Sequence, residues 1–163
     1  MKIYLASDHG GFELKNALAA YLKESPKYEV EDCGADKFDS NDDYPEIIAR
    51  AARKLSADAL KGMDSRAIVI GASGQGEAIV ANRFKGVRCA LYYGPASRAQ
   101  TDIGGKELDI ILSAREHNNA NALSLGARFI TVDEAKQIVE KWLETGFPGE
   151  ERHSRRIQKI DEV

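Results

Sequence analysis

The residues best suited to chemistry gather in a glycine-rich segment, 71–77, which reads GASGQGE. Its three glycines allow a ligand to approach the backbone closely, and the amides at the start of a helix favour an anion. Glu77 would lie in the first helical turn, where a carboxylate either complements the helix dipole or acts as a general base on the bound group. The segment lacks the Gly-Lys-Ser/Thr of a nucleotide phosphate loop, and Ile79 interrupts the dinucleotide fingerprint.

Histidine occurs at three positions, each with polar neighbours: His9 in SDHGG, His117 in REHNNAN and His153 in RHSRR. No two of them have the spacing of a zinc-binding pair, so we expect no metal site. Asp8 and His9 end an apolar run beside two glycines. In that place Asp8 can cap a turn while the ring nitrogens of His9 form hydrogen bonds within the protein. Alternatively, both side chains can contact a ligand.

Cations recur near the end of the chain. Arg152, Arg155, Arg156 and Lys159 have the spacing of one helical face, which is either a solvated basic face or a fork of arginines for a phosphate group. Arg128 is a further candidate cation. A carboxylate base, an amide cradle, a histidine and an arginine cluster on one small domain together suggest a phosphorylated substrate that undergoes proton transfer.

Short apolar runs alternate with amphipathic stretches along the chain. The predicted strands are 2–6, 28–33, 66–71, 87–93 and 125–130. Helical periodicity lies between them, and the strongest stripe, 132–143, predicts a final amphipathic helix. This alternation predicts right-handed βαβ units and a mainly parallel five-stranded sheet. Ligands of such sheets bind at the carboxyl ends of the strands, which is where SDHGG and GASGQGE lie.

Composition limits the class of protein. The chain has 163 residues and no linker, which fits a single domain over 1–163. Its formal net charge of −3 argues against a nucleic-acid partner. No apolar run is long enough for a membrane span, and the N-terminus does not read as a signal peptide. Cys33 and Cys89 are too few for a disulfide framework and are expected to be buried in a reducing cytoplasm.

These motifs resemble the ribose-5-phosphate isomerase B family, which includes galactose-6-phosphate isomerase subunits. The matching segments are SDHGGFELK (7–15), DYP (43–45), GASGQGEAIVAN (71–82), GVRCAL (86–91), REHNNAN (115–121), LGARFI (125–130) and RHSRRIQKI (152–160). The resemblance implies a Rossmann-like three-layer α/β/α sandwich and a cytoplasmic enzyme without metal or cofactor. It also implies a homodimer, with a tetramer left open, whose active sites lie between subunits.

The family divides by its catalytic base. One branch places a cysteine at the end of the third strand, where this chain has Gly71. The other branch uses a glutamate in a Gly-Ser-Gly-x-Gly-Glu pattern, and the chain is similar to that branch. The resemblance therefore implies that Glu77 moves a proton between C2 and C1 of ribose 5-phosphate through a cis-enediolate, giving ribulose 5-phosphate. Asp8, with His9, would first open the furanose ring.

The resemblance also implies binding roles. Ser73, with the amides around two glycines, would stabilise the developing oxyanion, while the cations would hold the phosphate, some of them from the partner chain. No catalytic step is assigned to His117. The residues expected to bind substrate are Gly74, Gly76, Asn118, Arg128, Arg152, His153 and Arg156.

Two departures from the family pattern keep alternatives open. Tyr93 stands where the cysteine branch often has a ring-opening histidine, so ring opening falls to Asp8 and His9. The chain also carries an inserted segment at about 94–114, which we expect near the sugar pocket or the dimer interface. The alternatives are an isomerase of another aldose phosphate, either a hexose 6-phosphate or another pentose phosphate, and a non-catalytic phosphosugar-binding protein.

Overall fold

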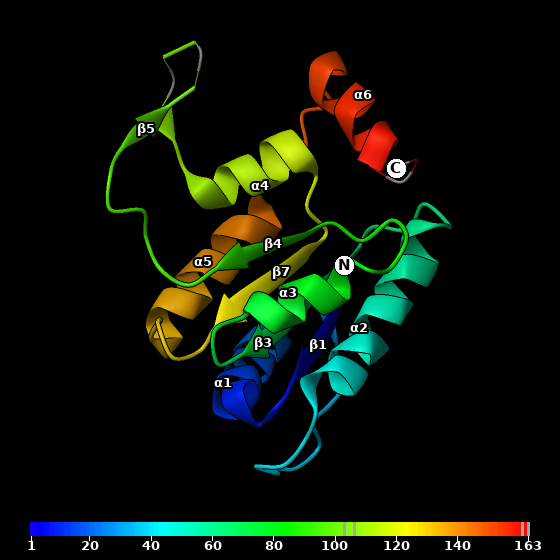
Figure 1. The fold of residues 1–163 in the computed structure, drawn as a ribbon, viewed down its shortest axis with the longest axis vertical. Helices are drawn as coiled ribbons and strands as arrows, with labels where there is room; N and C mark the ends of the chain where they lie inside the picture. The colour runs from blue at the N-terminus through cyan, green and yellow to red at the C-terminus, as the bar shows by residue number, and fades with distance from the viewer. Residues whose placement is uncertain (103, 106, 161, 163) are drawn as a thin grey trace.

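Five parallel strands form the centre of the computed structural model, which describes residues 1–102, 104–105, 107–160 and 162 (Figure 1). In spatial order they are β2 (Glu29–Asp32), β1 (Lys2–Ser7), β3 (Ser65–Gly71), β7 (Ala122–Gly126) and β4 (Cys89–Tyr92). Every neighbouring pair in this sheet is parallel. The predicted five-stranded sheet is therefore confirmed, and its strands are all parallel.

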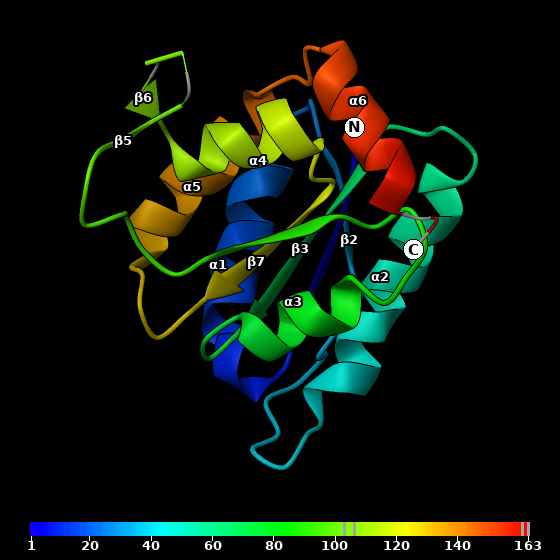
Figure 2. The same ribbon diagram turned by 45° about the horizontal axis from the view of Figure 1, so that its top comes forward.

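Helices cover both faces of the sheet (Figure 2). One face is covered by α1 (Phe12–Lys23), α5 (Val132–Glu144) and α4 (Ile110–Asn118), and the other by α2 (Tyr44–Ala59) and α3 (Gln75–Ala81). Two further helices complete the chain: the short 3₁₀ helix η1 (His9–Gly11) and α6 (Glu151–Ile160). This arrangement is the expected three-layer α/β/α sandwich.

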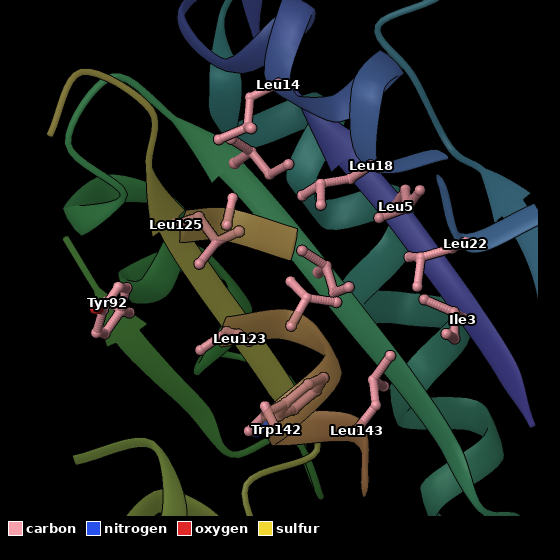
Figure 3. Packing of buried hydrophobic residues seen from close by; sticks show 14 of the residues in the cluster. Ile3, Leu5, Leu14, Leu18, Leu22, Tyr92, Leu123, Leu125, Trp142 and Leu143 are labelled. Carbon is pink, nitrogen blue, oxygen red and sulfur yellow. The ribbon is translucent and has the colours of Figure 1, made fainter. Parts of the chain in front are cut away.

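Alternation along the strands builds a separate core on each face. In β1, Ile3 and Leu5 point into one cluster, while Tyr4 and Ala6 belong to the other. Figure 3 shows the first cluster, in which leucines of α1 pack over β1 and Trp142 of α5 lies fully buried. Burial on both faces explains why β3 reads as an almost continuous apolar run.

One strand lies earlier in the sequence than predicted. The expected strand at 125–130 is wrong, because β7 spans Ala122–Gly126 and the chain turns directly after it. The amides of Ala127 and Arg128 bond to the carbonyls of Gly71 and Ala72 instead of continuing a ladder. The turn thereby draws Arg128 towards the glycine-rich segment that follows β3.

The strand order places the reversal of winding between β1 and β3. From β1 the chain moves outward to β2 on one side; it then returns to β3 on the other side, continues to the edge strand β4 and comes back to β7 between them. Loops diverge at such a point and leave a crevice at the carboxyl ends of the strands. The loops after β1 and β3 carry Asp8 and Glu77, and the register Ser7–Ile70 brings their origins side by side.

The inserted segment and α6 lie away from that crevice. Part of the segment 94–114 forms a small antiparallel hairpin, β5 (Gln100–Thr101) with β6 (Glu107–Leu108), and its end begins α4. Figures 1 and 2 show α6 beside α4, at the end of the sheet where the strands begin. Over the described part of the chain, no helix is long and apolar enough to cross a membrane.

Candidate active site

Glu77 lies in the first turn of α3, as predicted, and its side chain turns back towards the end of β3. The residue is only 5% exposed. A Cβ built on Gly71 would overlap the carboxylate of Glu77, so glycine at the end of β3 makes the space that the carboxylate fills. Burial raises the pKa of Glu77, and the nearby charge of Asp8 raises it further. A buried carboxylate with a raised pKa is suited to take and return a proton.

Asp8 is the N-cap of η1 and is 7% exposed. One carboxylate oxygen, Oδ1, accepts the amide of Gly10 at 3.0 Å. Burial raises the pKa of Asp8, the charge of His9 opposes this shift, and Asp42 adds to it. The charge of Asp8 reaches Glu77 and raises its pKa, so the two buried carboxylates lie near one another.

His9 is held by a residue that the sequence did not single out. Its Nδ1 lies 2.6 Å from Oδ1 of Asp42, and its backbone amide donates to the same oxygen at 3.2 Å. The hydrogen bond to Asp42 raises the pKa of His9, burial lowers it, and the charge of Asp8 adds to the rise. Asp42 lies in a polar loop 33 positions away, and no local spacing signals that contact.

The same three side chains form a possible cation site. In the described part of the chain, Asp8, His9 and Asp42 each offer one ligand atom within 4.8 Å of the others. Carboxylate and imidazole ligands are compatible with several divalent metals. Two of the three side chains, those of His9 and Asp42, are joined by a hydrogen bond.

The glycine-rich loop is shaped by close packing on β4, β7 and α2. Gly74 has φ 75°, and a Cβ there would lie 2.8 Å from Leu91 Cδ1. A side chain on Gly76 would meet the ring of Tyr44 at 2.7 Å. Ser73 directly precedes Gly74 on a partly exposed turn, and its Oγ accepts the amide of Gln75 at 3.4 Å. Backbone amides and one hydroxyl thus lie beside the first turn of α3, the kinds of donor that an oxyanion site uses.

The remaining predicted residues form a second group at the other end of the sheet. A pocket of about 630 Å³ is lined by Asn118, Arg152, His153 and Arg156. His153 is buried and stacks on His117 with ring centroids 4.5 Å apart and an interplanar angle of 6°. Burial lowers the pKa of His153, and neighbouring cations lower it further.

The structure thus divides the predicted site. Asn118 ends α4, just before β7 begins, whereas Glu77 and Asp8 follow the carboxyl ends of their strands. A five-residue strand such as β7 alone spans about 17 Å. Within one chain, the arginines of α6 are therefore not brought to the base. Arg128 is the exception among the predicted cations, because it lies near enough to lower the pKa of His9.

Comparison with known proteins places these features in a family. The sequence model described as ribose/galactose isomerase matches residues 3–104 and 106–160. Ribose-5-phosphate isomerase B of Mycolicibacterium paratuberculosis is 41% identical over 162 residues, covering 99% of this chain and 91% of that protein.

Solved structures agree with the sequence match. Ribose-5-phosphate isomerase B of Mycoplasma genitalium with bound ribulose-5-phosphate has a TM-score of 0.83 at 35% identity, over 99% of this chain and 94% of that one. The ribose 5-phosphate isomerase of Thermotoga maritima has a TM-score of 0.79 at 40% identity, over 99% and 98% of the two chains. With its fold, its paired carboxylates and these matches over nearly its whole length, the chain belongs to the ribose/galactose isomerase family.

Proposed function

We propose that this protein is an aldose–ketose isomerase that interconverts ribose 5-phosphate and ribulose 5-phosphate by general acid–base catalysis, without a metal or cofactor. The observation that carries the proposal is the carboxylate of Glu77, buried over Gly71 beside a second buried carboxylate, Asp8. The relatives that match over nearly the full chain are named for this activity.

Glu77 acts on the open-chain sugar. It removes the proton from C2 of the aldose, and the electron pair left behind forms the C1–C2 double bond of a cis-enediolate. The electrons of the C1 carbonyl pass to O1, and the proton of the C2 hydroxyl moves to this oxygen. Glu77 then returns its proton to C1, and the C2 oxygen becomes the ketone. Charge develops on oxygen during this step, and the amides around Gly74 and Gly76 with the hydroxyl of Ser73 stabilise it. Asp8 and His9 open the furanose ring beforehand.

The enzyme works as a homodimer with shared active sites. Phosphate binding needs cations, and Arg152, His153 and Arg156 line a pocket at the opposite end of their own chain from Glu77. A twofold partner can bring that pocket, with Asn118, to the crevice where Arg128 already lies. The phosphate is then bound by one chain and the sugar carbons react on the other.

The chain forms one isomerase domain that acts in the cytoplasm. One central five-stranded sheet with helices on both faces supports the first statement. The two cysteines, Cys33 and Cys89, are free, which suits a reducing compartment. The inserted segment 94–114 contributes Asp102 to the pocket of the α6 arginines, so we assign it a place beside the substrate phosphate.

The direct test compares wild type with Glu77→Gln in the conversion of ribose 5-phosphate to ribulose 5-phosphate, with a chelator present. A general base contributes roughly a hundred- to ten-thousandfold, so the variant should lose turnover by that factor. Equal turnover in the two proteins would remove Glu77 from the mechanism, and loss of wild-type turnover to the chelator would contradict metal-free chemistry.

The same assay separates the proposal from its alternatives. Faster wild-type turnover of a hexose 6-phosphate or another pentose phosphate would reassign the substrate and point to the inserted segment. Tight binding of ribose 5-phosphate with neither turnover nor exchange of the C2 hydrogen with solvent would instead identify a phosphosugar-binding protein.

A further inference from the structure

The loop between β2 and α2 holds the imidazole of His9 from two sides. Oδ1 of Asp42 lies 2.6 Å from Nδ1, and it also accepts the backbone amide of His9 at 3.2 Å. The ring of Phe38 meets the imidazole edge-on, with centroids 6.2 Å apart and an interplanar angle of 85°. One hydrogen bond and one aromatic contact orient the ring, and the amide contact holds the backbone of His9 to the same oxygen.

This orientation decides which nitrogen is available to a ligand. With its Nδ1–H donated to Asp42, the imidazole presents Nε2 on the opposite side of the ring. The side chain of His9 is 33% exposed, whereas that of Asp42 is 12% exposed. The imidazole is thus the more exposed member of the pair, and Nε2 is its nitrogen that is not bonded to Asp42.

The charges around His9 favour its protonated form. Asp42 and Asp8 face it from the loop and from the end of β1, with Asp8 Oδ2 at 3.9 Å from Nδ1. Arg128, from the turn after β7, opposes them. Hydrogen bonding to Asp42 is the largest influence, and it raises the pKa of the imidazole.

We propose that Asp42 is a positioning residue that makes His9 the proton donor for opening the sugar ring, a step separate from the proton transfer that Glu77 performs. The inference rests on the proposed function. In this step the C1–O4 bond breaks and its electron pair goes to O4, which takes the proton from Nε2 of His9. The proton of the C1 hydroxyl passes to the carboxylate of Asp8 as the C1 carbonyl forms. Exchange with solvent then returns Asp8 and His9 to their starting states.

The two steps can be measured separately, because ribulose 5-phosphate has no free C5 hydroxyl with which to form a furanose. Exchange of its C1 hydrogen with deuterated solvent, followed by NMR, therefore needs Glu77 but no ring opening. Conversion of cyclic ribose 5-phosphate needs both steps.

In Asp42→Asn, the charge is lost while the size of the side chain is kept. We expect conversion of ribose 5-phosphate to fall at least about tenfold, within the hundred- to ten-thousandfold that a complete general acid contributes. Exchange into ribulose 5-phosphate should stay at the wild-type rate, which also shows that the variant is folded. The pKa of His9, followed by NMR, should fall. The alkaline limb of the pH–rate profile for conversion of ribose 5-phosphate should move to lower pH with it.

Asp39→Asn is the matched control, because Asp39 is an exposed carboxylate of the same loop and its hydrogen bond is to the amide of Asn41. Both rates and the His9 titration should stay at wild-type values in it. Equal loss of conversion and exchange in Asp42→Asn, or no loss of either, would overturn the role of Asp42. Absence of both reactions in wild type would be a different result, because it would refute the proposed function itself and the inference with it.

Discussion

Glu77 has its charge in a place from which most water is excluded, and this affects folding as well as catalysis. Burial raises the pKa of the carboxyl, so at neutral pH the folded chain bears a cost for ionising it that the unfolded chain does not. A base for proton transfer is therefore expected to reduce stability at the pH where it works.

Glu77→Gln should accordingly raise the melting temperature at pH 7. The sign follows from the raised pKa: the stability linked to this group is present below its unfolded pKa and is lost as pH rises through the folded pKa. The variant should gain about 2–4 °C for each kcal/mol relieved at pH 7, and the gain should disappear at acidic pH, where the carboxyl is neutral in both states. Calorimetry across this pH range tests it, and a gain that is constant with pH would contradict the argument.

Gly71→Ala tests the space that the base occupies. The three atoms nearest to a Cβ at this position all belong to the Glu77 carboxylate, so the added methyl group should displace that carboxylate and leave the strand in place. We expect kcat to fall by about a hundredfold, the effect of misplacing a catalytic group by about 1 Å.

Two further variants complete that test. Gly146→Ala is the control, since a Cβ there meets nothing within 4 Å, and it should keep the wild-type kcat. Adding Gly71→Ala to Glu77→Gln should cause no further loss, because the displaced group is already inactive. Wild-type kcat in Gly71→Ala alone would show that the carboxylate does not act from this place.

At the scale of elements, hydrophobic patterning was a sufficient guide both to a helix with one buried face, α5, and to a strand buried on both faces, β3. The final amphipathic stripe became α5, and the apolar run before the glycine-rich segment became β3. The last strand was misplaced because LGARFI is apolar enough for a strand, yet its second half turns and bonds to the loop after β3. Those long-range hydrogen bonds leave no periodic trace in the sequence.

The residues of the candidate site also divide into those that the sequence could predict and those that it could not. Asp8 and Glu77 were predictable because topology brings the ends of β1 and β3 together, whatever the details of packing. Asp42 was not, because a loop without periodicity gives no register and its partner His9 is 33 residues away. The helical spacing of the arginines in α6 predicted that they cluster. Their position relative to Glu77 depends on the proposed dimer, which the spacing does not describe.

At the scale of the whole molecule, the proposed dimer with shared active sites makes a quantitative prediction. Glu77→Gln and the double variant Arg152→Ala, Arg156→Ala should each be nearly inactive alone. When equal amounts are unfolded and refolded together, half of the dimers are mixed, and each mixed dimer has one site free of substitutions. Activity should recover to about a quarter of the wild-type value.

The control mixes Glu77→Gln with the double variant after separate refolding, under conditions in which dimers do not exchange, and it should recover nothing. Failure of the co-refolded sample to recover activity, with mixed dimers demonstrated by mass, would place the base and the cations of each site on the same chain.

The overlap between Gly71 and the Glu77 carboxylate also bears on ancestry. A cysteine at the end of β3 and a glutamate in the first turn of α3 would occupy one volume, so a chain cannot hold both bases in working position. A lineage that exchanges the cysteine base for the glutamate base by single substitutions must pass through a sequence whose base is obstructed or through a sequence that has no base. The two branches of the family are thus separated by a fitness valley that the geometry of one glycine creates, and intermediate sequences should be rare among living descendants.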